Sequence, residues 1–373
     1  MSVASDPDTD ARLMAAAIRL GGRELGRTWP NPAVGALVVR DDGGGSVIVG
    51  RGWTRAGGRP HAETEALAEA GDRARGATCY VSLEPCSHHG RTPPCAEALA
   101  NAGVARVVSA LEDPDRRVSG RGHALLRAAG IAVEVGVCAD LAQQANAGHV
   151  MRITEGRPRV TLKLAVSRDG MIAGPGGKPV AITGARARAE THMMRATHDA
   201  ILVGIGTVLA DDPQLTCRLP GMAERSPVRV VLDSRLRMPV EARLLQDQQV
   251  PVWTITGEDP PERLRGPMEG AGATVLPVGP GPGGRVSARA ALTALAAQGI
   301  TRVLIEGGAA VAASFVEEGL VDEAVIFEGP IDIGTDGVPA GSGLAEVLSG
   351  GAYRRAGHVS LGEDVMSTYL RIR

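Results

Sequence analysis

The chain has 373 residues, which exceeds what one ordinary core needs and suits two domains that each bury their own apolar surface. Its formal net charge of -2 and its aromatic content of 2% argue against the basic field and base-stacking platforms of nucleic-acid-binding proteins, so small-molecule partners are expected. Five cysteines, an odd number, and the absence of any apolar run of membrane-spanning length favour the cytoplasm over a membrane or a disulfide-rich secreted protein.

The first half of the chain alternates between helical and strand-like patterns. Apolar residues recur at helical spacing behind the candidate N-cap Asp10 and predict a helix over 8–25. Two β-rich runs over 35–40 and 46–50, separated by a glycine-rich loop, predict a hairpin. Such alternation predicts a layered α/β domain with a mostly parallel sheet. The elements that follow the hairpin are a helix over 61–70, a strand over 77–83, a helix over 94–102, a strand over 105–111, a helix over 122–129 and a strand over 131–137.

The second half repeats this alternation after a weakly patterned stretch, and its elements predict a second α/β domain. We place the boundary near Gly156, which divides the chain into domains over 1–150 and 157–373. Glycine and proline are dense over 257–285, which predicts a surface loop. The predicted elements are strands over 160–167, 200–206, 228–233, 302–306 and 322–327, and helices over 186–196, 288–297 and 309–318.

Three residues that are distant in the first half have the chemistry of a zinc site. His61 stands at the start of a helix, Cys86 follows an apolar strand, and Cys95 comes nine positions later. One imidazole and two thiolates are the ligands of a catalytic zinc that keeps a fourth position for water, whose pKa the metal lowers to about 7. Glu63, two residues beyond His61, is near enough to move protons without being a ligand. This is the division of labour of zinc deaminases.

Each part of this pattern also has an ordinary structural interpretation. A His-Ala-Glu segment alone at a helix start most often belongs to an ordinary capped helix. Its combination with the later Pro-Cys favours a zinc site. Eight residues separate the two cysteines, where general zinc deaminases have two, and they would hold His88 and Arg91 beside the metal to grip a phosphorylated substrate. Otherwise these residues form a solvated loop. The remaining cysteines, each more simply a buried small hydrophobe, are Cys79, Cys138 and Cys217.

Three segments of the first half, PNPAVG over 30–35, PHAE over 60–63 and EPCSHHGRTPPC over 84–95, resemble the deaminase domain of the riboflavin-biosynthesis bifunctional deaminase/reductase family. Without the resemblance, Asn31 between two prolines is more simply a turn residue. The chain departs from the family pattern at Thr54 and Asp115, which affects substrate contacts rather than the chemistry. The resemblance implies a cytidine-deaminase-like three-layer α/β fold, zinc at His61, Cys86 and Cys95, Glu63 as the proton shuttle, and substrate contacts from Asn31, His88 and Arg91.

Two polar segments of the second half follow predicted strands. TVLADDPQLTCR over 207–218 comes after one strand, and Glu306-Gly307-Gly308 leads directly into a helix. The carboxyl ends of strands in open α/β sheets hold ligands, and glycines before a helix let backbone N–H groups approach a pyrophosphate. A Gly-Gly before a helix is also often only a tight turn, so phosphate binding is one of two interpretations.

These two segments, together with LKLA over 162–165 and SRDG over 167–170, are similar to the reductase domain of the same family. The similarity implies a dihydrofolate-reductase-like α/β domain that uses NADPH to reduce the ribosyl group of the deaminated product to ribityl. The implied substrate contacts are Arg195, Leu215, Arg218 and Glu306. The implied cofactor contacts are Ala165, Ala181, Thr207, Asp211, Ser234, Gly308, Ala309, Ala310, Val311, Ala312, Ala313 and Ser314.

Some of these implied contacts have competing structural interpretations. Asp211 is otherwise a helix cap or an Asx-turn residue, and Arg195 on a helix is otherwise a solvated charge. Where family members carry Ser-x-Trp, this chain has Pro179-Val180-Ala181, so a stacking partner for the nicotinamide is expected to be missing.

The predicted function is a bifunctional enzyme of riboflavin biosynthesis. A zinc-dependent deaminase would act on 2,5-diamino-6-(5-phosphoribosylamino)pyrimidin-4-one, and an NADPH-dependent reductase would act on the resulting 5-amino-6-(5-phosphoribosylamino)uracil. One alternative is a nucleoside or nucleic-acid zinc deaminase with an unrelated C-terminal domain, which the near-neutral charge opposes. Another is a zinc-stabilised binding module, which would not need Glu63. The resemblance also implies a homodimer or higher homo-oligomer formed through the second half.

Overall fold

The computed structural model describes residues 6–43, 45–89 and 93–372. The chain divides into two compact units, Met1–Gly156 (unit 1) and Arg157–Arg373 (unit 2). Among the described ranges, no helix combines the length and the apolar character that crossing a membrane requires.

A five-stranded sheet forms the middle of unit 1, in the order β2-β1-β3-β4-β5. Strand β1 pairs antiparallel with β2 and with β3, whereas β3, β4 and β5 run parallel, so the sheet is mixed rather than mostly parallel. The predicted hairpin of the first two strands is confirmed. The strands are β1 (Gly35–Asp41), β2 (Ser46–Trp53), β3 (Thr78–Val81), β4 (Arg106–Ser109) and β5 (Ala132–Val135).

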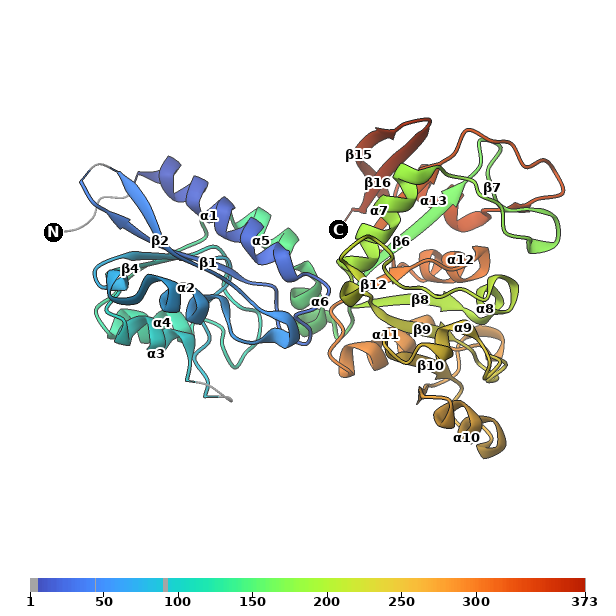
Figure 1. Ribbon diagram of the computed structural model, residues 1–373, viewed down its shortest axis with the longest axis horizontal. Coiled ribbons are helices and arrows are strands. Elements are labelled where there is room, and N and C mark those ends of the chain that lie inside the picture. Colours follow the sequence, from blue (N-terminus) through green and yellow to red (C-terminus); the bar gives the residue numbers. More distant parts are fainter. Residues whose placement is uncertain (1–5, 44, 90–92, 373) are drawn as a thin grey trace. The chain divides into compact units, whose positions relative to one another are not determined.

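Helices cover both faces of this sheet and give unit 1 three layers, as predicted (Figure 1). Leu37 and Val39 pack on one face with α1 and α5, while Ala36 and Val38 pack on the other face with α2, α3 and α4. Successive residues therefore alternate between the two faces, which is the period of a strand. The helices are α1 (Pro7–Gly21), α2 (Ala62–Ala70), α3 (Cys95–Asn101), α4 (Arg121–Ala128), α5 (Ala139–Ala145) and α6 (Ala147–Glu155).

Helix α2 lies close against β2 because two glycines of the strand carry no side chain. A Cβ placed on Gly52 would lie 1.9 Å from the carbonyl oxygen of Ala62, and one on Gly50 would lie 2.1 Å from that of Ala66. Any larger residue would push the helix away from the sheet. The first turn of α2, which carries Glu63, is thereby fixed against the sheet.

Unit 2 contains a nine-stranded sheet in the order β11-β10-β9-β8-β12-β6-β13-β16-β15. The strands from β11 to β13 run parallel, and a C-terminal antiparallel hairpin of β15 and β16 extends the sheet beyond β13. A small separate sheet pairs β7 with β14. The strands are β6 (Arg159–Val166), β7 (Met171–Ala173), β8 (Ala200–Gly204), β9 (Val228–Leu232), β10 (Val252–Thr256), β11 (Ala273–Pro277), β12 (Arg302–Ile305), β13 (Glu323–Glu328), β14 (Val338–Pro339), β15 (Tyr353–Leu361) and β16 (Asp364–Arg371).

The carboxyl ends of β9, β8 and β12 lie side by side at one edge of this sheet, because the three strands are parallel neighbours. Helix α8 begins directly after β8, so the strand predicted over 200–206 ends earlier, at Gly204. Helix α12 begins just after β12. The helices are α7 (Ala185–Ala196), α8 (Ile205–Asp211), α9 (Arg243–Gln246), α10 (Glu262–Gly270), α11 (Ala288–Ala297), α12 (Ala309–Glu317) and α13 (Ser342–Ser349).

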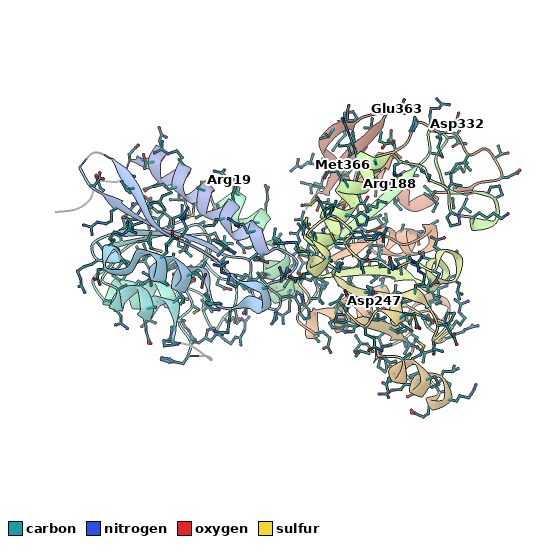
Figure 2. The ribbon with its side chains drawn as sticks, in the orientation of Figure 1. Arg19, Arg188, Asp247, Asp332, Glu363 and Met366 are labelled. Carbon is teal, nitrogen blue, oxygen red and sulfur yellow. The ribbon has the colours of Figure 1, made fainter. Side chains whose placement is uncertain are left out.

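A buried charge anchors β9 within the sheet. Arg229 is fully buried, and its guanidinium donates to Asp247 from Nη1 to Oδ2 at 2.9 Å and from Nη2 to Oδ1 at 2.7 Å. Asp247 is labelled in Figure 2. Two parallel charge-assisted hydrogen bonds compensate a guanidinium that would otherwise be costly to bury.

The prediction of a surface loop over 257–285 is wrong for much of that range. Helix α10 occupies Glu262–Gly270 and strand β11 occupies Ala273–Pro277. Met268 and Val275 are buried in a core shared with the neighbouring strands, so tertiary packing overrides the local glycine and proline content. The sequence patterns also miss β10, α13 and the C-terminal hairpin.

Candidate active sites

Three candidate metal ligands converge in unit 1. His61 immediately precedes α2, Cys95 begins α3, and Cys86 lies on the segment between β3 and α3. Nδ1 of His61 is 3.7 Å from Sγ of Cys86 and 3.4 Å from Sγ of Cys95, and the three atoms lie within 4.8 Å of one another. Zinc bonds of about 2.1 Å to nitrogen and about 2.3 Å to sulfur place tetrahedral ligands about 3.6 Å apart. The three atoms therefore fit one zinc ion.

The two sulfurs are not equivalent. A hydrogen bond from the Cys95 thiol, supported by one from His61, lowers the pKa of Cys86 to about 4 against the opposing effect of burial. The backbone N–H of Cys95 also donates to Sγ of Cys86 at 3.3 Å. Because these donors favour the thiolate, Cys86 is prepared to bind a cation.

Glu63 lies in the first turn of α2, where its side chain is buried and only 4% of the residue is exposed. Burial raises the pKa of its carboxyl to about 7, although the charge of His61 acts in the opposite direction. A carboxyl group that titrates near neutral pH can both accept a proton and return it. Glu63 lines the same cavity as His61 and Cys86.

This cavity has a volume of about 210 Å³. It is lined by those substrate contacts predicted for the deaminase that fall within the described residues. Asn31 and His88 both line it, and Nδ2 of Asn31 donates to the carbonyl oxygen of Gly58 at 2.9 Å, which orients the amide. Arg91 lies outside the described residues. Asp115, the departure from the family pattern, also lines the cavity. So do five other charged or titratable residues that the sequence patterns did not single out, namely Arg59, Asp113, Arg117, His149 and Arg152.

Two of these residues, Asp113 and Asp115, each have a basic partner. Nε2 of His149 is 3.2 Å from Oδ1 of Asp113. Nε of Arg117 lies 3.0 Å from both carboxylate oxygens of Asp115, and this pairing lowers the pKa of Asp115 to about 2. The acidic residue that departs from the family pattern at position 115 is thus compensated by a guanidinium two residues later.

Glu84 holds the loop that carries these residues. Glu84 stands two residues before Cys86 in the chain and is buried, with 4% of the residue exposed. The carboxylate of Glu84 fixes the loop that contains Asp113 by accepting four backbone hydrogen bonds. The position of Glu84 in the Glu-Pro-Cys motif is the feature of the sequence that could have identified this residue. Glu84 accepts hydrogen bonds from the backbone N–H groups of Asp113 at 3.2 Å, Gly120 at 2.9 Å, Gly122 at 2.9 Å and His123 at 3.3 Å.

In unit 2, two predicted substrate contacts form an ion pair at the carboxyl end of β12. Arg195 donates to Glu306 from Nε at 2.7 Å and from Nη2 at 2.9 Å, and its Nη1 donates to the carbonyl oxygen of Thr216 at 3.0 Å. Lys163 is close enough for its charge to interact with Glu306, and burial lowers the pKa of this lysine. Lys163 was not singled out from the sequence, although a lysine inside an otherwise apolar strand is a usable signal.

The other two predicted substrate contacts differ in exposure. Arg218 is exposed, its backbone N–H donates to Nδ1 of His192 at 3.3 Å, and partial burial together with the charge of Arg195 lowers its pKa. Two guanidiniums near each other suit an anionic group. The side chain of Leu215, by contrast, is buried in the core, and its φ of 57° places it in the left-handed region.

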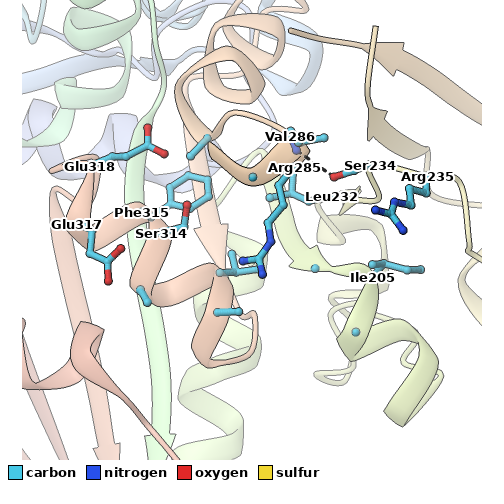
Figure 3. A pocket seen from close by; sticks show the side chains of 18 of the residues that line it. Ile205, Leu232, Ser234, Arg235, Arg285, Val286, Ser314, Phe315, Glu317 and Glu318 are labelled. Atoms are coloured by element: carbon cyan, nitrogen blue, oxygen red, sulfur yellow. Dashed lines mark hydrogen bonds between the residues drawn. The ribbon is translucent and has the colours of Figure 1, made fainter. Parts of the chain in front are cut away.

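A larger cavity of about 850 Å³ lies between the carboxyl ends of β8 and β9 and helix α12 (Figure 3). Five predicted cofactor contacts line it, namely Ser234, Ala310, Val311, Ala313 and Ser314. Ala312 is fully buried in the core and Ala181 is exposed elsewhere. In the described part of the chain, the predicted contacts that do not line this cavity are Ala165, Ala181, Thr207, Asp211, Gly308, Ala309 and Ala312.

The size of the cavity and the glycines near it suit a dinucleotide. Its volume falls within the range of about 300–1,000 Å³ that is common for small-molecule sites. The first turn of α12, capped by Gly308, lines the cavity through Ala310 and Val311, and the N–H groups and positive dipole end of that turn suit a pyrophosphate. A Cβ on Gly204 would lie 2.8 Å from the side chain of Val311, so this glycine keeps the cavity wall open. Arg235 and Arg285 also line the cavity, and the sequence patterns did not single them out.

Two protein families match separate parts of the chain. The family described as "Cytidine and deoxycytidylate deaminase zinc-binding region" matches residues 7–111, and the family described as "RibD C-terminal domain" matches residues 158–366. The alternative in which the C-terminal domain is unrelated to the reductase is therefore wrong.

Curated relatives and solved structures cover nearly the whole chain. The riboflavin biosynthesis protein RibD of Aquifex aeolicus is 37% identical and covers 98% of this chain and 99% of its own, and that of Escherichia coli is 40% identical and covers 88% and 89%. A RibD structure from Acinetobacter baumannii has a TM-score of 0.87 at 37% identity, over 99% of this chain and 100% of its own. A deaminase/reductase structure from Thermotoga maritima has a TM-score of 0.84 at 32% identity, over 98% and 99%. The chain therefore belongs to the RibD family and is a bifunctional deaminase and reductase of riboflavin biosynthesis, with zinc and NADPH as its cofactors.

Proposed function

We propose that residues 1–150 deaminate 2,5-diamino-6-(5-phosphoribosylamino)pyrimidin-4-one and that residues 157–373 reduce the product, 5-amino-6-(5-phosphoribosylamino)uracil. The observation that carries the proposal is the convergence of His61, Cys86 and Cys95 beside the buried carboxyl of Glu63. The Thermotoga maritima relative is described as a deaminase and reductase for these compounds.

In the deaminase, Glu63 moves protons. Zinc, when bound to His61, Cys86 and Cys95, supplies an activated water. The carboxylate of Glu63 accepts a proton from that water and returns it to the leaving amine, for which its pKa of about 7 is suited. The oxygen of water replaces the 2-amino group of the pyrimidinone, and ammonia leaves, so atoms and charge balance.

Polar residues around the cavity would orient the phosphoribosyl pyrimidine. Asn31 and His88 line the cavity and are proposed substrate contacts, as is Arg91. Asp113, held by His149 and Glu84, adds a carboxylate acceptor for the amino or hydroxyl groups of the substrate.

In the reductase, Lys163 is the proposed proton donor. The cofactor, when bound, would supply a hydride for C1′ of the ribosyl group, and the ring oxygen would then need a proton as the ring opens to a ribityl chain. Lys163 lies in the electrostatic reach of Glu306, and burial lowers its pKa, which favours release of a proton. Arg195, Glu306, Arg218 and the backbone of Leu215 are the proposed substrate contacts.

The cofactor is proposed to occupy the large cavity of unit 2. Ser234 and four residues of α12, namely Ala310, Val311, Ala313 and Ser314, line that cavity and support the assignment. The remaining sequence-based contacts, Ala165, Ala181, Thr207, Asp211, Gly308, Ala309 and Ala312, stay predictions.

One experiment tests both halves of the proposal. The purified full-length protein is given the diaminopyrimidinone ribotide with and without NADPH, and each product is identified by mass spectrometry. Exchange of one amino group for oxygen is expected without NADPH, and the further gain of two hydrogens is expected with it. An unchanged ribotide with zinc-loaded protein would refute the deaminase assignment, and a deaminated product that NADPH leaves unchanged would refute the reductase assignment.

The proposal extends to compartment and assembly. The five cysteines form no disulfide with one another, which fits a reducing cytoplasm. We propose a homodimer or higher homo-oligomer formed through unit 2, and light scattering during size-exclusion chromatography measures this directly. A monomer at all protein concentrations would contradict it.

A further inference from the structure

One face of helix α6 forms part of the wall of the deaminase cavity. His149, Arg152 and Ile153 line the cavity, and their spacing of three and four residues places them on one face of the helix. Of the three, only His149 is buried, with 8% of the residue exposed. The proton transfers assigned to Glu63 do not involve this imidazole, so its place in the cavity wall needs another physical reason.

The imidazole of His149 contacts one oxygen of the Asp113 carboxylate. Nε2 of His149 lies 3.2 Å from Oδ1 of Asp113, and the backbone N–H of Asp115 donates to the same oxygen at 2.9 Å. The other oxygen, Oδ2, accepts no hydrogen bond from any residue within the described ranges. Because two donors hold Oδ1, rotation of the carboxylate is restricted, and Oδ2 is left for a group in the cavity.

The surroundings of the His149 ring show which nitrogen carries the proton. A carboxylate only accepts hydrogen bonds, so Nε2 must be protonated for its contact with Asp113 to be a hydrogen bond. Nδ1 is buried and has no hydrogen-bond partner in the described part of the chain. The side chains of His149 and Asp113 are only 8% and 10% exposed, so water screens their contact little. A ring whose one polar contact is Asp113 is suited to orient that carboxylate.

Contacts connect Asp113 to the metal end of the cavity and to two of its arginines. Glu84, which accepts the backbone N–H of Asp113 at 3.2 Å, stands two residues before a zinc ligand. Arg117 is close enough for its charge to interact with Asp113, and Arg152 follows His149 by about one turn of α6. A pyrimidine at the metal and a phosphate near these guanidiniums would place the ribosyl group beside Asp113.

We propose that His149 is a positioning residue of the deaminase, which holds Oδ1 of Asp113 so that Oδ2 accepts a hydrogen bond from a ribosyl hydroxyl group. This inference rests on the proposed function of unit 1 as a deaminase of the ribotide. His149 acts on substrate binding and takes no part in proton transfer. Its loss should therefore change KM and leave kcat nearly constant.

Steady-state kinetics of ammonia release by the full-length, zinc-loaded protein test this role. His149→Phe keeps a ring but removes the donor, and it should raise the KM for the ribotide roughly tenfold while kcat changes less than about threefold. His149→Gln restores an N–H donor and should bring KM back to within about threefold of wild type. Thr154→Ala is the matched control, because Thr154 is exposed on α6 and does not line the cavity.

A double variant shows whether His149 acts through Asp113. Asp113→Asn should raise KM by itself, and the addition of His149→Phe should raise it less than about twofold further, because the carboxylate to be oriented is gone. Independent effects that multiply would overturn the proposal. So would an equal rise of KM in His149→Phe and His149→Gln with unchanged thermal unfolding, because the donor would then make no difference.

Nitrogen NMR of the full-length protein with isotope-labelled histidine tests the geometry without turnover. The signals of His149 are identified by their loss in His149→Gln, and a proton is expected on Nε2. A bare Nε2 would overturn the proposal whatever the kinetics show. Wild-type protein that releases no ammonia from the ribotide would refute the deaminase function itself, whereas normal release with an unchanged KM in His149→Phe would overturn only the role of His149.

Discussion

Arg195 and Glu306 meet through two parallel hydrogen bonds, from Nε to Oε1 at 2.7 Å and from Nη2 to Oε2 at 2.9 Å, although they lie on different elements of unit 2. Both side chains are nearly buried, with exposures of 11% and 9%. The planar guanidinium matches both carboxylate oxygens at once, which a lysine could not do. The pair therefore fixes the end of β12 relative to α7, where the substrate is proposed to bind.

Removing the arginine should destabilise unit 2 strongly. In Arg195→Ala, Glu306 keeps a buried charge without its partner, and we expect a loss of about 3–5 kcal/mol in the free energy of unfolding. Urea denaturation of the unit 2 transition measures this loss. Arg188→Ala on the same helix is the control, because Arg188 is exposed and should cost less than about 1 kcal/mol (Figure 2). Equal losses in the two variants would contradict the importance of the pair.

Substitution of Glu63 should separate metal binding from proton transfer. Glu63→Gln keeps the shape of the side chain but cannot accept a proton, so ammonia release should fall by a factor of about 10²–10⁴. Zinc content, measured by atomic absorption, should remain, because the ligands are His61, Cys86 and Cys95. Reduction of separately supplied deaminated product should also be unchanged. Ammonia release at the wild-type rate would remove Glu63 from the mechanism.

His198 should make unit 2 sensitive to acid. It is buried, its Nδ1 lies 2.7 Å from the carbonyl oxygen of Met194, and its Nε2 lies 3.0 Å from Oγ1 of Thr161. Burial lowers the pKa of His198 from 6.5 to about 3. The unfolded chain takes up a proton near pH 6.5 and the folded chain does not until about pH 3. The stability due to this group is therefore complete above pH 6.5 and is lost as the pH falls.

The expected size of this effect is about 1.4 kcal/mol per pH unit below pH 6.5. Urea unfolding of wild type and His198→Gln between neutral pH and about pH 5 gives the slope of the free energy of unfolding against pH for each protein. The difference between the two slopes cancels the contributions of other titratable groups. The wild type should lose stability more steeply. Identical slopes would show that His198 does not carry this proton uptake.

The features that the sequence predicts best are those carried by short local motifs or by a regular spacing of apolar residues. The ligands His61, Cys86 and Cys95 stand in motifs that an ordinary fold does not require, so they could be identified before their geometry was known. The alternation of apolar residues likewise predicted most strands and helices. Strand β11 escaped prediction because it is short, lies among glycines and prolines, and becomes a strand only through pairing with β10.

Residues whose role depends on contacts between distant segments could not be predicted in this way. Asp113 and His149 are 36 positions apart, and Ser234 and Val286 are 52 positions apart, yet each pair is joined by a hydrogen bond. Nothing in the local pattern of either partner indicates the other. The hydrogen bonds that hold the cavity walls together therefore emerged from the fold, whereas the zinc ligands and some wall residues, such as Asn31 and Ser234, were predicted from motifs and from the family resemblance.

Glu84 offers a test of how such a contact controls the deaminase cavity. Its carboxylate accepts backbone N–H groups of Asp113, Gly120, Gly122 and His123, and Glu84→Gln would turn an amide donor toward some of them. We expect a loss of about 2–4 kcal/mol in unit 1 and faster amide hydrogen exchange over 112–123, because buried donors lose a charged acceptor. The KM for the ribotide should rise while zinc content stays constant.

Glu112→Gln is the control for this prediction, because Glu112 is exposed on the same loop and accepts a hydrogen bond from Oγ of Ser119 at 2.7 Å. Its exchange and KM should remain close to those of wild type. If Glu84→Gln raised KM without faster exchange over 112–123, the carboxylate would have to act on the substrate by another route. If exchange rose while KM stayed constant, the loop would not form part of the substrate site, and the proposed role of Asp113 as a substrate contact would fail with it.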